Sequence, residues 1–513
     1  MTRQITLSPV TRIEGHLAIR TKGEPTGEGT AHLVTEAHCE GEMFRGFEGI
    51  LRGRDPLDAQ QFVQRICGVC PIAHGMASCL AQDMAYGIRP TRNGRLLRNL
   101  ISVADYLQSH ITHFYHLSAL DFVDVTAVLR YGGSDRTLQT LKGRVAGAME
   151  RSRKGNELYP AAPFLPRYEG DYVADDDTNC ALLAHYVEAL EKRRVAEEMA
   201  AVFCAKLPHS TSIFPGGVTQ APTLERILAY RSRLKQLREF IQNVFVGDVV
   251  TAAQAFPGYW EMGRGYGDLL SYGMFEMDEA GTKFFPGGTW IDGKRGAVEV
   301  ERITEDVGHA RFSSGTGLHP SRGSTVAEPG KAGAYTWIKA PRYGGRPMEV
   351  GPLARVMMLW AAPNETAQKK EVEAVLKKLG VGAEKLVSVL GRHLCRVLEC
   401  KWLADQAFAW LEELEVDGAP AAEFTLPKQA EGYGLTEASR GALGHWISIE
   451  EHKISNYQCV VPTTWNCSPR DDAGRPGPLE KALEGVVVAN PDQPLEVGRV
   501  VRSFDPCLAC AIH

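Results

Sequence analysis

The segment RICGVCPIAHG, Arg65–Gly75, carries the most informative pattern in this 513-residue chain. Pro71 suits the first position of a helix, because its missing N–H would be unpaired there in any case. Cys70 then lies at the helix N-terminus, where unpaired amides and the helix dipole stabilise a thiolate. His74 follows one turn later on the same face, within reach of a sulfur that binds a metal. The spacing predicts a ligand-bearing loop that opens a helix.

A second C-x-x-C pair, DPCLACAIH, closes the chain at Asp505–His513. Twelve cysteines are too few for a disulfide scaffold, and the eight outside the two pairs show no ligand-like grouping. No thioredoxin-like strand–helix–strand pattern surrounds either pair, which disfavours a disulfide oxidoreductase. A Cys₄ zinc site stays open, although zinc ribbons usually separate their pairs by about 15–20 residues. The two pairs, Cys67/Cys70 and Cys507/Cys510, therefore indicate metal chemistry.

The composition excludes several functional classes. Lys and Arg total 57 against 62 Asp and Glu, a net charge of −5, so nothing indicates nucleic-acid binding. The most apolar stretch, residues 353–362, is short and contains Arg355, so we expect no direct membrane span. The N-terminal residues MTRQITLSPVTRIEG lack the features of a secretory signal. No G-x-G-x-x-G or Walker loop supports nucleotide binding.

Hydrophobic periodicity predicts a predominantly helical α+β protein. We expect one unit over residues 1–513, with a β-rich part at about 1–40, a helical core and a C-terminal metal-binding segment at about 435–513. A Gly-rich irregular region should cover 260–350. The expected helices are 67–124, interrupted at Gly87 and Pro90; 181–206, capped by Asp177 or Thr178; 222–246; and 365–415.

Seven further motifs, together with the two cysteine pairs, give the chain a family resemblance. It resembles the large subunit of nickel–iron hydrogenases, most nearly the periplasmic uptake-type enzymes and the nickel–iron–selenium branch, with Cys507 in place of selenocysteine. The resemblance implies the large-subunit fold of that family, with small peripheral β-sheets. The motifs are PVTRIEGH (9–16), FRGFEGILRGRDPLDA (44–59), SHITHFYHLSALDFVD (109–124), KAPRYGG (339–345), EVGPLAR (349–355), SRGALGHW (439–446) and NYQCVVPTTWN (456–466).

The resemblance implies a nickel–iron centre on the four paired cysteines. Cys67 and Cys507 would be terminal nickel ligands, whereas Cys70 and Cys510 would bridge nickel and iron. Soft thiolates suit both metals. One carbon monoxide and two cyanides would complete the iron. Arg440 and Thr463 occupy the positions whose side chains hydrogen-bond the cyanides. Without the resemblance, Thr463 would be interpreted as an ordinary strand residue.

The same resemblance implies a second metal near the C-terminus, Mg²⁺ or Fe²⁺. Its ligands would be the side chains of Glu48 and His513 and the backbone carbonyl of Cys459. Alone, Glu48 would read as a solvated carboxylate. The Cys459 thiol itself is expected to be a small core group.

The implied reaction is reversible heterolytic cleavage of dihydrogen. The leading proton acceptor is the Cys507 thiolate; Arg440 is the second candidate, but deprotonating a guanidinium is very costly. Glu14 matches the family's proton relay, and burial should raise its pKa. Asp505 and Arg440 remain in the polar canopy above the metals, whereas Ser109 and Ser439 replace the Asp and Pro of many membrane-bound uptake members.

Partners follow from what the motifs lack. No iron–sulfur motif accompanies the cysteine pairs, yet electrons must leave singly, so an iron–sulfur small subunit is expected, with a redox partner such as a cytochrome. Co-export with that subunit would place the chain in the periplasm or at the membrane; the cytoplasm stays open. The alternatives are a hydrogen-sensing regulatory subunit and a scaffold like the related complex I subunit, which lacks the four cysteines.

Overall fold

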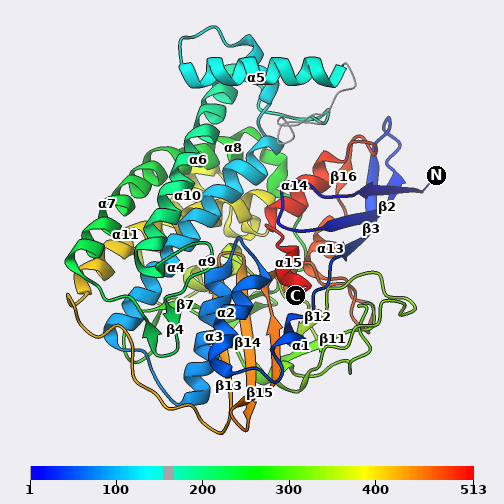
Figure 1. Cartoon of the computed structure of the whole chain (residues 1–513). Helices are drawn as coiled ribbons and strands as arrows, with labels where there is room; N and C mark the ends of the chain where they lie inside the picture. The colour runs from blue at the N-terminus through cyan, green and yellow to red at the C-terminus, as the bar shows by residue number, and fades with distance from the viewer. Residues whose placement is uncertain (1, 154–166) are drawn as a thin grey trace.

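The computed structural model describes residues 2–153 and 167–513, and its largest part is a helical assembly (Figure 1). Helix α4 runs through the middle of this assembly and is buried along nearly its whole length. Its apolar residues favour one face, and the opposite face is buried as well because polar side chains there, such as Arg98 and Asn99, hydrogen-bond to protein groups. Around it pack α3, α6 and α11, with α7 against α6 and α11. The helices are α3 (Pro71–Tyr86), α4 (Arg92–Thr112), α6 (Asp176–Cys204), α7 (Leu224–Phe240), α8 (Val246–Ala255), α10 (Ala367–Leu379) and α11 (Val389–Glu413).

The expected helices are present, with shifted boundaries. Helix α6 begins at Asp176 rather than 181, because Asp175 is the N-cap and its carboxylate accepts a hydrogen bond from the Thr178 amide. The segment 222–246 is α7, which continues through a π-helical turn, Ile241–Phe245, into α8. The segment 365–415 is two helices, since α10 ends at Gly380, whose left-handed backbone forms the C-cap.

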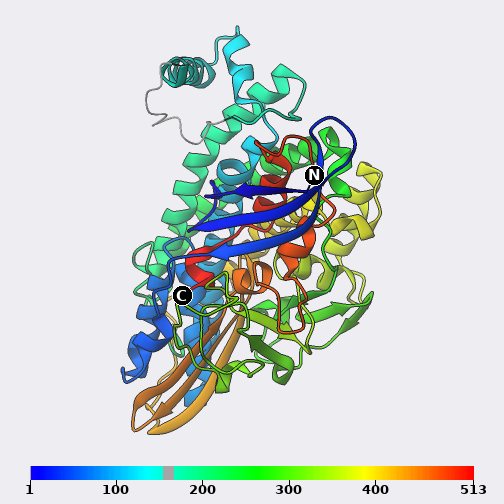
Figure 2. The ribbon, with the colours of Figure 1, turned by 90° about the vertical axis from the view of Figure 1, so that its right-hand side faces the viewer.

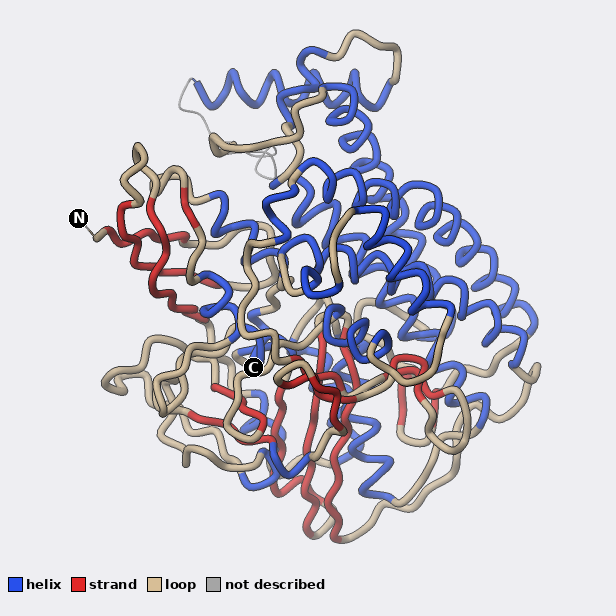
Figure 3. The backbone as a smooth tube through the Cα atoms, turned by 180° about the vertical axis from the view of Figure 1, so that it is seen from behind, coloured by secondary structure: helices blue, strands red, loops and turns tan. Residues whose placement is uncertain are grey.

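An antiparallel sheet forms the β-rich N-terminal part. Its strand order is β1–β2–β3–β16, so a strand from near the C-terminus completes it. The region 260–350 contains only short strands joined by loops, as predicted (Figure 3). The strands are β1 (Arg3–Leu7), β2 (Leu17–Pro25), β3 (His32–Gly41), β16 (Val487–Val488), β4 (Ile213–Phe214), β5 (Gly217–Val218), β6 (Leu269–Ser271), β7 (Met274–Glu276), β8 (Lys283–Phe285), β9 (Gly288–Ile291), β10 (Lys294–Gly296), β11 (Ile303–Asp306) and β12 (Ala340–Tyr343).

A three-stranded meander, β13 (Gln429–Ala438), β14 (Gly441–Glu450) and β15 (Lys453–Val460), packs against α3. Two glycines of β13 permit a close approach. A Cβ on Gly434 would lie 2.1 Å from the Ala77 carbonyl oxygen, and one on Gly432 would lie 2.3 Å from that of Ala81. The helix backbone therefore lies directly on the sheet. This contact sets the distance between the Cys67–Cys70 loop, at the start of α3, and the sheet.

The C-terminal residues end inside the molecule, between the N-terminal sheet and α2–α3 (Figure 2). His513 is only 5% exposed, and one apolar core extends from Ile5 to Ile512. In the described residues no helix combines the length and apolarity that crossing a membrane requires. The remaining α-helices are α1 (Phe47–Leu51), α2 (Ala59–Val63), α5 (Arg136–Arg153), α9 (Pro352–Trp360), α12 (Pro462–Asn466), α13 (Pro478–Leu483), α14 (Leu495–Ser503) and α15 (Leu508–Ala511).

Candidate metal centre

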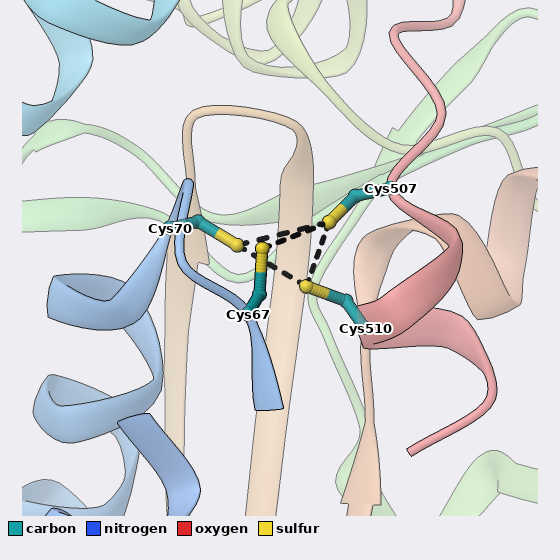
Figure 4. Close-up of side chains that lie close together, drawn as sticks. All are labelled: Cys67, Cys70, Cys507 and Cys510. Carbon is teal, nitrogen blue, oxygen red and sulfur yellow. Dashed lines mark hydrogen bonds between the residues drawn. The ribbon is translucent and has the colours of Figure 1, made fainter. Parts of the chain in front are cut away.

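The two C-x-x-C pairs meet in one buried cluster (Figure 4). The Cys67 and Cys507 sulfurs are 3.4 Å apart, and those of Cys70 and Cys510 are 3.2 Å apart. All four sulfurs lie within 4.8 Å of one another, and none of the four residues is in a disulfide. Four convergent thiols with no bond between them are a ligand set for soft transition metals.

Short, rigid segments hold the two pairs face to face. Cys70 is the N-cap of α3, as predicted, and Cys507 immediately precedes α15. Arg45 bridges the two segments, because its Nη2 donates to the carbonyls of Ile66 and Ala509 at 2.6 and 2.7 Å. The cluster geometry therefore does not depend on the sulfurs alone.

The electrostatics of the thiols differ in one respect from the sequence prediction. The expected thiolate was Cys70, at the helix N-terminus. Instead, hydrogen bonds from Cys507, Cys510 and Cys70 lower the pKa of Cys67 well below its usual value. For Cys70, hydrogen bonds from Cys507 and Cys510 lower the pKa, but the Cys67 sulfur and burial outweigh them and raise it.

Arg440 reaches the cluster from the tip of the β13–β14 hairpin, a two-residue turn with Ser439. Its Nη2 lies 3.0 Å from Asp505 Oδ1, its Nε donates to the Asp505 carbonyl, and its buried Nη1 has no protein partner. Arg355 fixes the turn by donating to the carbonyls of Ala438 and Ser439. A buried, oriented N–H without an acceptor is consistent with an acceptor ligand at this place.

Thr463 contacts the Cys507 segment, and the two canopy serines, Ser109 and Ser439, contact each other. Thr463 Oγ1 accepts from the Cys507 amide at 3.0 Å, so its own O–H remains free to donate. It lies in the short helix α12 rather than in a strand. Ser439 Oγ donates to Ser109 Oγ at 2.9 Å. Ser109 and Ser439, the two positions at which many membrane-bound uptake hydrogenases have other residues, are thus in direct contact.

Glu14 connects the cluster to less buried surroundings. Its half-buried carboxylate lies 3.1 Å from Cys507 Sγ and accepts from the Ala509 amide at 2.9 Å. Backbone pairing of Glu14 with Pro506 and Leu508 fixes the two segments together. Burial raises the pKa of Glu14, as predicted, and the nearby Cys67 sulfur raises it further.

His74 contacts the opposite side of the cluster. Its Nε2 lies 3.3 Å from Cys510 Sγ and its Nδ1 lies 3.2 Å from His445 Nε2. Burial lowers the pKa of His74 to about 4. The ring is therefore neutral at pH 7, with one N–H to donate.

A second cluster surrounds the C-terminal residue. Oxygen, sulfur and nitrogen atoms of Glu48, Cys459 and His513 lie within 4.8 Å of one another, with His513 Nε2 3.1 Å from Glu48 Oε1. The Cys459 amide donates to Glu48 Oε1 at 2.8 Å. Its sulfur, predicted to be only a small core group, also lies within ligand distance of Glu48 and His513. Burial would raise the pKa of Glu48, but Lys339 and His513 outweigh it and lower the pKa.

Comparison with known proteins decides the family. The family model described as nickel-dependent hydrogenase matches residues 45–513. This chain belongs to the nickel-dependent hydrogenase family. The periplasmic [NiFeSe] hydrogenase large subunit of Desulfomicrobium baculatum is 41% identical over 99% of this chain and 95% of that protein. The quinone-reactive Ni/Fe-hydrogenase large chain of Wolinella succinogenes is 36% identical over 100% and 96%.

Solved hydrogenase structures agree with the fold. An H₂-activated [NiFeSe] hydrogenase from Dm. baculatum superposes with a TM-score of 0.88 at 40% identity, and one from D. vulgaris Hildenborough with 0.88 at 39%. Each comparison covers all of both chains. The chain is therefore a hydrogenase large subunit with the fold of that family, and the fold and enzyme predictions are confirmed.

Within this hydrogenase subunit, motif reasoning missed the groups around Glu48. Lys339 Nζ lies 3.3 Å from Glu48 Oε2, 3.4 Å from Glu305 Oε2 and 3.0 Å from Gln458 Oε1. Thr325 also donates to Glu48. Lys339 is the first residue of the KAPRYGG motif, and Gln458 lies in NYQC. The motifs therefore contained both residues, but nothing in the sequence indicated that they contact each other or Glu48.

Proposed function

We propose that the four cysteines hold a nickel–iron pair whose iron carries one carbon monoxide and two cyanides. Cys67 and Cys507 would serve as terminal nickel ligands, and Cys70 and Cys510 would be shared between the two metals. The convergence of four unbonded, buried sulfurs supports this assignment. The unpartnered Nη1 of Arg440 and the free O–H of Thr463 suit the nitrogen ends of the cyanides. No selenium is involved, since residue 507 is cysteine.

The centre, when bound, polarises dihydrogen and supports its reversible heterolytic cleavage. Cys507 and Glu14 then move the proton. Sγ of Cys507 takes the proton beside the metals, and the Glu14 carboxylate, 3.1 Å away, receives it and passes it outward.

Arg440 holds charge rather than acting as a base. Burial opposes its charged form, but Asp505 and the ligand sulfurs outweigh burial and raise the pKa of Arg440 well above its usual value. A guanidinium stabilised in this way does not give up its proton. The Arg440–Asp505 pair thus fixes an oriented positive charge beside the metals.

Dihydrogen needs a way in, and a cavity of about 250 Å³ adjoins the Cys67–Cys70 loop. Val69 of that loop and Ile72 of α3 line it together with Ala104 of α4 and Ala196 of α6. Polar side chains also line it: Asp105, Gln108, Arg193 and Glu197. We propose that this cavity is part of the route that dihydrogen takes to the metals.

The second cluster is proposed to bind Mg²⁺ or Fe²⁺. Glu48, held ionised by Lys339 and His513, supplies an oxygen ligand, His513 a nitrogen and Cys459 its carbonyl. Oxygen-rich coordination suits a hard divalent ion. The ion would tie the last residue of the chain to α1, close to Cys510.

The route by which electrons leave and the cellular location of the enzyme both depend on other subunits. Among the described residues two groups of side chains could hold a metal, and both are assigned above, which leaves no further group of ligands for an electron-carrying cluster. We propose an iron–sulfur small subunit as electron acceptor, a cytochrome or similar redox partner beyond it, and a periplasmic or membrane-associated enzyme exported with that subunit. The relatives named periplasmic and quinone-reactive favour this over a hydrogen sensor.

Hydrogen-dependent dye reduction by the purified complex tests the proposal. Wild type should reduce the dye and contain nickel and iron. Cys507→Ser should abolish both nickel retention and activity, whereas Cys180→Ser, in α6 and outside the two metal clusters, should change neither. Full activity and nickel content in Cys507→Ser would overturn the assignment.

A further inference from the structure

A row of buried hydrogen bonds runs from the cluster into the sheet. His74 of α3 contacts Cys510 Sγ, and its other nitrogen contacts His445 Nε2 of β14. His445 Nδ1 lies 2.8 Å from the Tyr457 hydroxyl of β15. These three side chains are at most 1% exposed. The row therefore links a metal-ligating sulfur to two strands that carry no metal ligand at these positions.

The row exists because α3 lies directly on the sheet. His445 pairs with Gly434 on one side and with Cys459 on the other. Tyr457 is two residues before Cys459, so its side chain shares a face with that of His445. Gly434 has no side chain to hold α3 away, and His74 thereby comes within hydrogen-bond distance of β14.

The direction of donation along the row is fixed from its metal end. A thiolate bound to metal only accepts, so His74 Nε2 must carry the hydrogen. Among the described residues neither ring has a carboxylate as hydrogen-bond partner, and both rings are buried, which favours neutral imidazoles. His74 Nδ1 then accepts from His445 Nε2–H, and His445 Nδ1 accepts from the Tyr457 O–H.

We propose that His445 and Tyr457 are positioning residues that fix His74 as a hydrogen-bond donor to the bridging sulfur of Cys510. The inference rests on the proposed nickel–iron centre. By withdrawing electron density from that sulfur, the row lowers the electron density at iron.

The row polarises the sulfur but does not conduct protons. Beyond Tyr457 it continues to the Ser78 hydroxyl, which accepts in turn from the Gln82 side-chain amide at 3.3 Å. Ser78 and Gln82 follow His74 at successive four-residue steps on one face of α3. An amide N–H does not readily pass a proton on, so the row ends in a fixed donor. Consecutive bonds with one direction strengthen one another.

The test is the infrared spectrum of the assembled holoenzyme carrying Tyr457→Phe. Removing the Tyr457 O–H leaves His445 Nδ1 without a hydrogen-bond donor. His445 is then no longer held as a donor to His74, and the hydrogen bond from His74 Nε2 to Cys510 Sγ weakens. Electron density at iron rises, and the carbon monoxide stretch should move to lower wavenumber. Tyr230→Phe is the matched control, because Tyr230 is equally buried and donates only to the Leu100 carbonyl. Its spectrum should equal that of wild type.

Coincident spectra of Tyr457→Phe and wild type would overturn the inference while leaving the metal centre intact. Absence of carbon monoxide and cyanide bands in wild type would overturn the proposed function and, with it, the inference. If Tyr457→Phe fails to retain the metals, a fluorinated tyrosine incorporated at position 457 replaces it. Its more acidic O–H donates more strongly and should move the stretch to higher wavenumber; an unchanged stretch would again overturn the inference.

Discussion

Glu14 places a half-buried carboxylate 3.1 Å from a ligand sulfur, and the proposed proton route depends on it. Glu14→Gln keeps the shape and the hydrogen bond from the Ala509 amide but cannot take up a proton. We expect hydrogen oxidation to fall by about 10²-fold or more, the usual contribution of a positioned acid–base group. Steady-state assays with nickel and iron analysis of the same sample measure this.

The matched control for Glu14→Gln is Glu42→Gln, an exposed carboxylate outside both metal clusters, which should leave the rate unchanged. Turnover by Glu14→Gln at near the wild-type rate would remove the relay. Loss of metal together with activity would instead show that Glu14 acts through the structure of the cluster.

Some site residues could be predicted from the sequence, and others could not. The cysteine pairs, Glu14 and Glu48 were predictable because each lies in a contiguous motif with fixed spacing. The contacts of Lys339 with Glu48 and Glu305, and of His445 with His74, were not. They join segments far apart in the chain, and only the packing of α3 on the sheet and of the loops around β12 brings them together.

Gly434 shows how one strand sets the position of the helix that begins at Cys70. Gly434→Ala would place a methyl group 2.1 Å from a carbonyl oxygen of α3, so the helix that begins at Cys70 must move. We expect a loss of about 1–3 kcal/mol in the free energy of unfolding, typical of overpacking, with reduced nickel retention. Denaturant titration and metal analysis measure both quantities.

Gly247→Ala is the control for this substitution, because nothing lies within 4 Å of a Cβ there and the residue is already in helix α8. It should be neutral or slightly stabilising. Equal stability and nickel content in Gly434→Ala and wild type would contradict the close helix–sheet contact.

Asp121 joins the segment before Glu14 to the helix before Cys507. Its Oδ1 accepts from Arg12 at 2.5 Å and from Arg502 of α14 at 2.7 Å. Burial would raise the pKa of Asp121, but Arg12 and Arg502 outweigh it and lower the pKa. Asp121→Asn leaves the buried Arg502 without its carboxylate and should cost about 3 kcal/mol at pH 7.

The pH dependence of this cost has a definite sign. The pKa of Asp121 is lower in the folded than in the unfolded protein. Its contribution to the free energy of unfolding is therefore complete above the unfolded pKa of about 4, and it is lost as the pH falls through the folded pKa. The stability gap between wild type and Asp121→Asn should therefore close only below about pH 4. Asp176→Asn, in an exposed ion pair with Arg130, should show almost no gap at any pH. A gap that closes between pH 8 and 5 would contradict the assignment.

Element boundaries follow local chemistry that periodicity alone does not reveal. The start of α6 was misplaced because its first turn, Asp176–Cys180, is mostly polar, while the N-cap carboxylate of Asp175 determines where the helix begins. The helix type and the burial of its apolar face were predictable, since both follow from the 3.6-residue period.

The whole molecule brings segments from near both chain termini to the four-cysteine cluster. Glu14 comes from near the N-terminus, Cys507, Cys510 and His513 from the final segment, and Cys67 and Cys70 from the loop before α3. Sequence motifs predicted which residues meet, but not that the last residue would be 5% exposed inside the molecule. That burial depends on packing between the N-terminal sheet and α2–α3.

An infrared spectrum of the purified complex, recorded between the amide and C–H regions, tests directly whether the four cysteines hold a nickel–iron pair with carbon monoxide and cyanide ligands. We predict one sharp carbon monoxide band and two cyanide bands, together with bound nickel and a larger amount of iron, because the iron–sulfur small subunit also contributes iron. Absence of these bands, with zinc as the bound metal, would contradict it and return the four cysteines to a structural role.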